Sequence, residues 1–174
     1  MDVKTHLAAL EKSEEFSSWK KEHPKSFLAH VFRMLDGVQD PIWQFGYYNE
    51  NDTMTTFFLT KEAVTIEAEQ EIMKANPIKE VQLSELQAGF GMALEAATAF
   101  QKEKYPKHEP LKTIAVLQVI SEKLVYNITF ITQKFDTLNL RVSAKEGTVI
   151  QDKLTALADM MRTFKPEDKP DYVG

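Results

Sequence analysis

The stretch WKKEHPK at residues 19–25 returns as FQKEKYPK at residues 100–107. In both places an amphipathic helix pattern precedes the stretch, and a run of strand-like segments follows it. An internal repeat of this kind indicates the architecture of a chain before any single motif is considered. The sequence therefore predicts two tandem units, residues 1–76 and residues 77–164, followed by a tail at residues 165–174.

The first unit reads as a helix followed by strands. Apolar residues at helical spacing predict one helix over residues 3–21, closed by Pro24. Residues 26–35 and 42–49 then read as strands, with a short helix as the rival interpretation of the former. Residues 54–67 alternate between apolar and polar side chains, which predicts either a pair of strands or one long bent strand.

The second unit repeats this order more clearly. Ser84 followed by Gln87 three residues later forms a capping-box pattern, which predicts a helix from there to about Tyr105. The segments that follow are predicted as strands at 114–120, 124–130 and 138–144, a short exit at 148–150, and a closing helix at 152–163.

Strands that are adjacent in sequence and joined by short turns pair in antiparallel fashion. The predicted class is therefore α+β, with two tandem units of one helix and three antiparallel strands, helices packed on one face of the sheet, and a C-terminal helix. The tail at residues 165–174 contains two prolines and little apolar surface to bury, so we expect it to be disordered.

Composition narrows the function classes. The 174 residues are 43% hydrophobic and 27% charged, as in an ordinary globular protein. Because cysteine is absent, disulfides, thiolate catalysis and thiolate metal sites are excluded. The net charge of −5 disfavours nucleic-acid binding. With no apolar run of about 20 residues and no apolar signal core, we expect a cytoplasmic protein that does not bind membranes.

Three stretches of the second unit carry a family resemblance: EAATAF at 95–100, KLVYNI at 123–128 and VSAKEGTVI at 142–150. With them the unit resembles a PepSY-type domain. The first unit is similar through IWQFGYY at 42–48 and LTKEAV at 59–64. It lacks the turn glycine that the second unit has at Gly147. The resemblance implies a non-catalytic module, often linked to restraining a protease. Such modules usually lie outside the cytoplasm, and the expected lack of a signal peptide differs from that pattern.

A second family shares the order of elements. Secretion chaperones that hold effector proteins are small, acidic, cytoplasmic and dimeric, with helices packed on a twisted sheet. The chain is similar to them in layout and charge.

Basic side chains gather in corresponding loops of the two units. They are Lys20, Lys21, His23 and Lys25 in the first, and Lys102, Lys104, Lys107, His108 and Lys112 in the second. Cations near helix C-termini complement the helix dipole, and this explains their placement. The alternative interpretation is an anionic ligand or acidic partner held between the two loops.

Other candidate groups favour structural interpretations. The four histidines, His6, His23, His30 and His108, lack the spacing of a metal site, so no metal is expected. Aromatic residues at alternating strand positions predict core packing. These residues are Trp43, Phe45, Tyr47, Phe57 and Phe58. The carboxylates Glu62, Glu67, Glu69 and Glu71 are typical of a solvated strand edge.

No nucleophile, phosphate-binding loop or metal motif is recognisable, so we expect no catalytic residues and no cofactor. The sequence predicts a non-catalytic module that binds another protein through its sheet face or edge. The candidate contact surface is the polar strand face formed by Asn127, Thr129, Asn139 and Arg141. Self-association through the same surface is an alternative, as are a cytoplasmic chaperone-like dimer and a small-molecule or enzymatic site in a pocket between helix and sheet.

Overall fold

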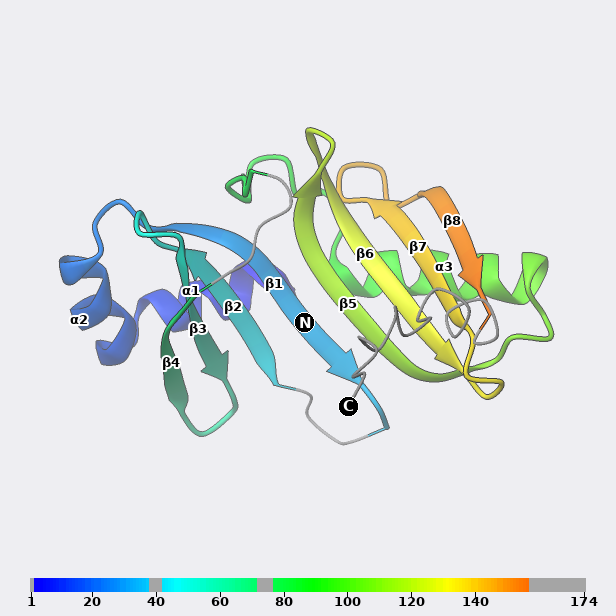
Figure 1. Cartoon of the computed structure of the whole chain (residues 1–174), viewed down its shortest axis with the longest axis horizontal. Helices are drawn as coiled ribbons and strands as arrows, with labels where there is room; N and C mark the ends of the chain where they lie inside the picture. Colours follow the sequence, from blue (N-terminus) through cyan, green and yellow to red (C-terminus); the bar gives the residue numbers. More distant parts are fainter. Residues whose placement is uncertain (1, 38–41, 72–76, 157–174) are drawn as a thin grey trace, which may run out of the picture.

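The computed structural model describes residues 2–37, 42–71 and 77–156, which form three helices and one antiparallel sheet of eight strands (Figure 1). The helices are α1 (Val3–Glu11), α2 (Glu14–Glu22) and α3 (Phe90–Lys104). The strands are β1 (Phe27–Leu35), β2 (Trp43–Tyr48), β3 (Thr53–Leu59), β4 (Val64–Glu71), β5 (Pro110–Ile120), β6 (Lys123–Thr132), β7 (Thr137–Ser143) and β8 (Val149–Thr155). The predicted α+β class with an antiparallel sheet is confirmed.

The sheet has the strand order β4-β3-β2-β1-β5-β6-β7-β8. Each of its halves, β1–β4 and β5–β8, is a meander of strands in sequence order, as short turns between antiparallel strands require. The halves join where β1 pairs with β5, with Val31 opposite Leu117 and Phe32 opposite Val116. Each half therefore has four strands, and the prediction of three was wrong because β4 and β8 were not counted as separate full strands.

The predicted closing helix is wrong over its first turn. Residues 152–155 belong to β8, where Leu154 lies opposite Leu138 and Asp152 lies opposite Leu140. The apolar spacing there fits a helix as well as a strand, and pairing with β7 decides between them. The rest of that predicted helix, the predicted disordered tail and the unit boundary at residue 76 lie outside the described residues.

The single helix predicted over residues 3–21 is instead two helices. Ser13 has extended backbone geometry, and its hydroxyl accepts a hydrogen bond from the Phe16 amide at 3.1 Å, so it is the N-cap of α2. Glutamates in the first turn of α2 and lysines in its last turn complement the helix dipole. Ser13, which interrupts the apolar pattern of the predicted helix, therefore marks the start of a second helix.

The predicted start of α3 at Ser84 is also wrong. Its N-cap is Gly89, and the preceding residues run in turns along the end of the sheet. The amides of Gln87 and Ala88 both donate to the Ala144 carbonyl, at 3.0 and 2.8 Å. Because Leu86 and Ala88 are buried as well, tertiary bonding outweighs the local capping signal.

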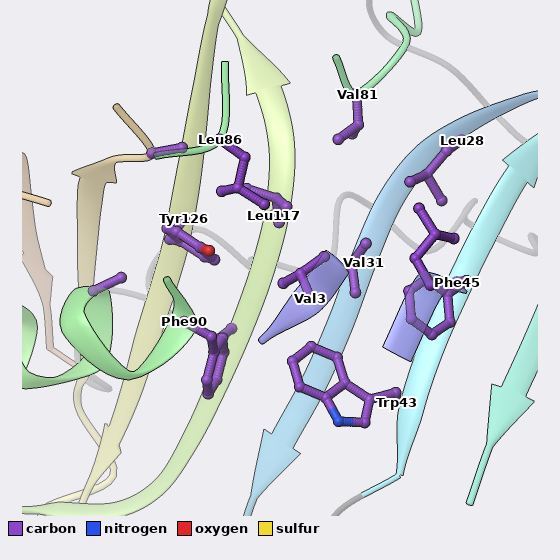
Figure 2. Close-up of a cluster of buried hydrophobic side chains, with 14 of the residues drawn as sticks. Val3, Leu28, Val31, Trp43, Phe45, Val81, Leu86, Phe90, Leu117 and Tyr126 are labelled. Atoms are coloured by element: carbon purple, nitrogen blue, oxygen red, sulfur yellow. The ribbon is translucent and has the colours of Figure 1, made fainter. Parts of the chain in front are cut away.

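Buried side chains from both halves form one hydrophobic cluster between the sheet and the helices. Figure 2 shows Val3 and Phe90, at the starts of α1 and α3, with Trp43, Leu117 and Tyr126 of the sheet. The Tyr126 hydroxyl donates to the Ala88 carbonyl at 3.0 Å inside this cluster. A shared interior of this size is the main source of stability for both halves.

No helix among the described residues is long and apolar enough to cross a membrane.

Candidate functional site

The two faces of the sheet differ in what lies on them. All three helices lie on one side (Figure 1), and we call that side the covered face. Side chains alternate along a strand, so Tyr126, Ile128 and Phe130 of β6 point to the covered face and are buried. Asn127 and Thr129 between them point to the opposite side, which we call the open face, and are half-buried. No helix in the described part of the chain lies on the open face.

The four residues predicted as a contact surface lie together on this open face. Asn127 is opposite Arg141, and Thr129 is opposite Asn139, across β6 and β7. The Asn139 amide nitrogen donates to Asn127 Oδ1 and to Thr129 Oγ1, both at 2.8 Å. The polar groups therefore hold one another in a fixed row, as cross-strand pairs do in sheets.

Arg141 extends this row toward the edge of the sheet. Its guanidinium donates to Gln151 Oε1 of β8 at 2.7 Å. Its Nε is buried and has no hydrogen-bond partner within the described residues. An arginine held by a neutral amide keeps its full charge and spare donors, so this side chain can still bind a carboxylate.

The strand register brings further cations to the same face. Lys153 lies opposite Asn139, and Lys112 lies opposite Ile131. Strands β5–β8 carry no Asp or Glu that points to the open face, since Asp152 points to the covered face beside Leu140. Neither lysine forms an ion pair with another described residue. A chain with a net charge of −5 thus presents a basic surface here.

The open face of the first half of the sheet is different. Phe32 and Met34 of β1 and Phe58 of β3 point to it, and Met34 is 40% exposed. These side chains continue into Ile114 and Val116 of β5. The open face therefore changes from apolar over the middle strands to polar and basic over β6–β8.

The two basic loops do not come together. They follow α2 and α3, whose C-terminal ends lie at opposite ends of the molecule (Figure 1). Lys20 donates to the Ser26 carbonyl at 2.6 Å, and Lys104 pairs with Asp152 at 2.9 Å. The geometry does not support an anion held between the loops, because the loops are far apart and two of their lysines, Lys25 and Lys104, pair with Glu50 and Asp152.

The loop histidines are also bound locally. His23 Nε2 lies 3.0 Å from Glu69 of β4, and its Nδ1 lies 2.9 Å from the Trp19 carbonyl. The bond to Glu69 raises the pKa of His23. His108 contacts Asp136 at 3.1 Å. In the part of the chain that the structure describes, no cluster of His, Cys, Asp or Glu is arranged to hold a metal ion.

Most of the aromatic candidates lie in the core. Trp43, Phe45, Tyr47 and Phe57 are buried on the covered face, while Phe58 lies on the open face. The glutamates 67, 69 and 71 lie on β4, the outermost strand of the first half, where they are exposed. Charges on such an edge oppose strand addition by another chain.

Two features escaped the sequence reading. Arg33 lies on the covered face, with its guanidinium 4.3 Å from the centre of the Trp43 ring and 5.0 Å from that of Phe90. His30 lies on the open face against Gly46. The strand pattern of β1 could have placed both residues on their faces, but only the register with β2 reveals their partners.

Comparisons with protein-family models, with curated protein sequences and with solved structures give no significant match.

Proposed function

We propose that this chain is a non-catalytic binding module whose contact surface is the open face of β6–β8. The partner is a protein whose contact region is rich in Asp and Glu. The observation that carries the proposal is the row of amide, hydroxyl and guanidinium groups on a sheet face that no described helix covers.

Charge complementarity supports an acidic partner. Arg141 and Lys153 point to this face, and Lys112 of β5 lies beside it, opposite Ile131 of β6. The strands β5–β8 bring no carboxylate to the open face. The rest of the chain is acidic enough to give a net charge of −5, so an acidic partner is repelled elsewhere and attracted here. Such complementarity sets both the orientation of a partner and its rate of association.

The organisation of the chain is consistent with a binding role. Each half of the sheet is preceded by a helical segment and consists of four strands that pair in sequence order. We interpret the halves as two tandem units, a proposal that includes the PepSY-like resemblance. In this reading the second unit supplies the contact surface. The first unit extends the shared core and adds an apolar area beside it.

The test compares three forms of the tagged, full-length protein in affinity capture from native lysate. These are the wild type, an Arg141→Glu/Lys153→Glu variant, and a Lys21→Glu/Lys102→Glu control. The control has the same change in net charge but alters exposed positions on α2 and α3. Quantitative mass spectrometry measures which proteins remain bound.

We expect the wild type and the control to capture an acidic protein. The Arg141→Glu/Lys153→Glu variant, which we call the open-face variant, should capture at least about tenfold less of it, because the new glutamates repel the carboxylates of the partner. Retention should also fall with added salt. If the open-face variant retains the same proteins as the control, the proposal is wrong. Sedimentation velocity on the purified forms identifies a second copy as the partner if the wild type dimerises and this variant does not.

A further inference from the structure

A cavity of about 650 Å³ opens where the two halves of the sheet meet. Its floor is formed by β1 and the end of β5, and its walls by residues 77–79 and the turn between β5 and β6. Ligand pockets in proteins commonly have volumes of about 300–1,000 Å³. This cavity is distinct from the row of polar groups on β6 and β7, none of which lines it.

Two polar side chains lie next to each other in the floor. His30 of β1 is directly opposite Gln118 of β5 in the strand register. Neither side chain has a hydrogen-bond partner within the described residues. Adjacent polar groups that are left without protein partners in a concave site are the groups that orient a ligand.

The position of His30 depends on a glycine. The imidazole lies against Gly46 of β2, and a Cβ on that residue would be 2.2 Å from His30 Cε1. The missing side chain therefore makes the space in which the ring is held. Burial lowers the pKa of His30, so the ring is neutral near pH 7 and offers one donor and one acceptor.

The remaining walls carry no free charge. Lys79 and Glu122, the two charged side chains of the lining, form an ion pair with each other. Ile78 and Ile120 supply apolar surface. A charged ligand would have to compete with this exposed ion pair for one of its members, which has a modest cost. Otherwise it would leave its own charge unpaired in the cavity, which costs more.

We propose that this cavity binds an uncharged small molecule with an apolar body and a carboxamide-like edge, in which a donor lies beside an acceptor. The edge bonds to His30 and Gln118, whose own donors and acceptors match it. The apolar body packs against the two isoleucines. This site does not depend on the proposed protein partner, because it uses other residues and another class of ligand.

Benzamide is a probe with these properties, and benzoate has the same shape with a charge. We would titrate each into the full-length, isotope-labelled protein and follow the backbone and imidazole resonances by NMR. For benzamide we expect saturable shifts at His30, Gly46 and Gln118, with a Kd of about 1–10 mM for so small a ligand. Benzoate should bind about tenfold more weakly or not at all.

Variants separate this site from general weak binding. Gln118→Leu should weaken benzamide binding about tenfold, whereas the matched Gln133→Leu, at an exposed position away from the cavity, should leave it unchanged. If the Gln118→Leu spectrum shows loss of folding, Gln118→Glu provides a second variant of nearly the same size. No saturable shift with benzamide, equal binding of benzoate, or unchanged binding by the folded Gln118 variant would each overturn the proposal.

Discussion

The covered face and the open face of the sheet are built from the same strands and differ in almost every other respect. Along β6, Tyr126, Ile128 and Phe130 are buried under the helices, and the residues between them keep polar groups on the other side. The covered face is filled by dispersion and apolar burial, which have little directional preference. The open face over β6–β8 is held by specific hydrogen bonds. Stability should therefore depend mainly on the first face, and recognition on the second.

The largest expected effect comes from shortening a side chain on the covered face. Ile128→Ala removes a side chain that is 0% exposed, so we expect the free energy of unfolding to fall by about 2–5 kcal/mol. Val116→Ala on the open face should cost less than half of that, since Val116 is only half-buried. Urea unfolding followed by tryptophan fluorescence measures both changes. Equal losses would mean that the open face is packed as fully as the core.

A second test uses the fit between His30 and Gly46. Gly46→Ala places a Cβ inside the imidazole, so we expect a loss of about 1–3 kcal/mol from overpacking. Gly91→Ala is the matched control, because a Cβ there meets nothing within 4 Å and lies in α3. It should stabilise the protein by up to about 1 kcal/mol through helix propensity. Chemical unfolding measures the change in the free energy of unfolding for each variant. A change of the same sign for Gly46→Ala and Gly91→Ala would contradict this account.

The hydrogen-bonded row should contribute less to stability. Asn139→Ala removes two bonds on a half-buried surface, and we expect a loss of about 0.5–1.5 kcal/mol. The thermal midpoint and the capture of the proposed partner are the two measurements. A loss as large as that of Ile128→Ala would show that the row is part of the core rather than a contact surface.

The smallest effects concern pH, and two histidines should act in opposite directions. Burial lowers the pKa of His30 below 6.5, so the unfolded chain takes up a proton at this residue before the folded chain does. The contribution of His30 to the free energy of unfolding therefore falls as pH drops below 6.5. The bond to Glu69 raises the pKa of His23. The contribution of His23 to the free energy of unfolding is therefore complete below pH 6.5. It is lost as pH rises through the pKa of His23 in the folded state.

Unfolding titrations at about pH 5 and about pH 8 test these signs. Relative to the wild type, His30→Gln should reduce the loss of stability toward acid. His23→Gln should reduce the loss toward alkaline pH. A reversed sign for either variant would mean that its histidine has a different environment from the one described.

Several features followed from local patterns in the sequence. The alternation of residues 124–130 and 138–144 was sufficient to predict β6 and β7, and it brought Asn127, Thr129, Asn139 and Arg141 to one face. The first two strands were predicted to within one or two residues. These predictions were right because the strand period is 2, so side-chain direction is fixed wherever the strand is recognised.

Other features were mispredicted where a local signal met a tertiary contact. The capping pattern at Ser84 was overridden by the bonds of Gln87 and Ala88 to Ala144. The helical pattern at Leu154 was overridden by pairing with Leu138. In both cases the local preference is worth about 1 kcal/mol or less, which burial and strand pairing exceed.

The sequence by itself determined the α+β class, the antiparallel pairing and the faces of β6 and β7, because these depend on spacing along the chain. Only the tertiary structure decided which strands meet at the centre, which face the helices cover and that His30 rests on Gly46 opposite Gln118. Those outcomes depend on contacts between residues far apart in sequence. No periodicity along one segment encodes the identity of its distant partner, so the cavity at His30 and Gln118 became visible only in three dimensions, whereas the polar face of β6 and β7 was already predicted by strand alternation.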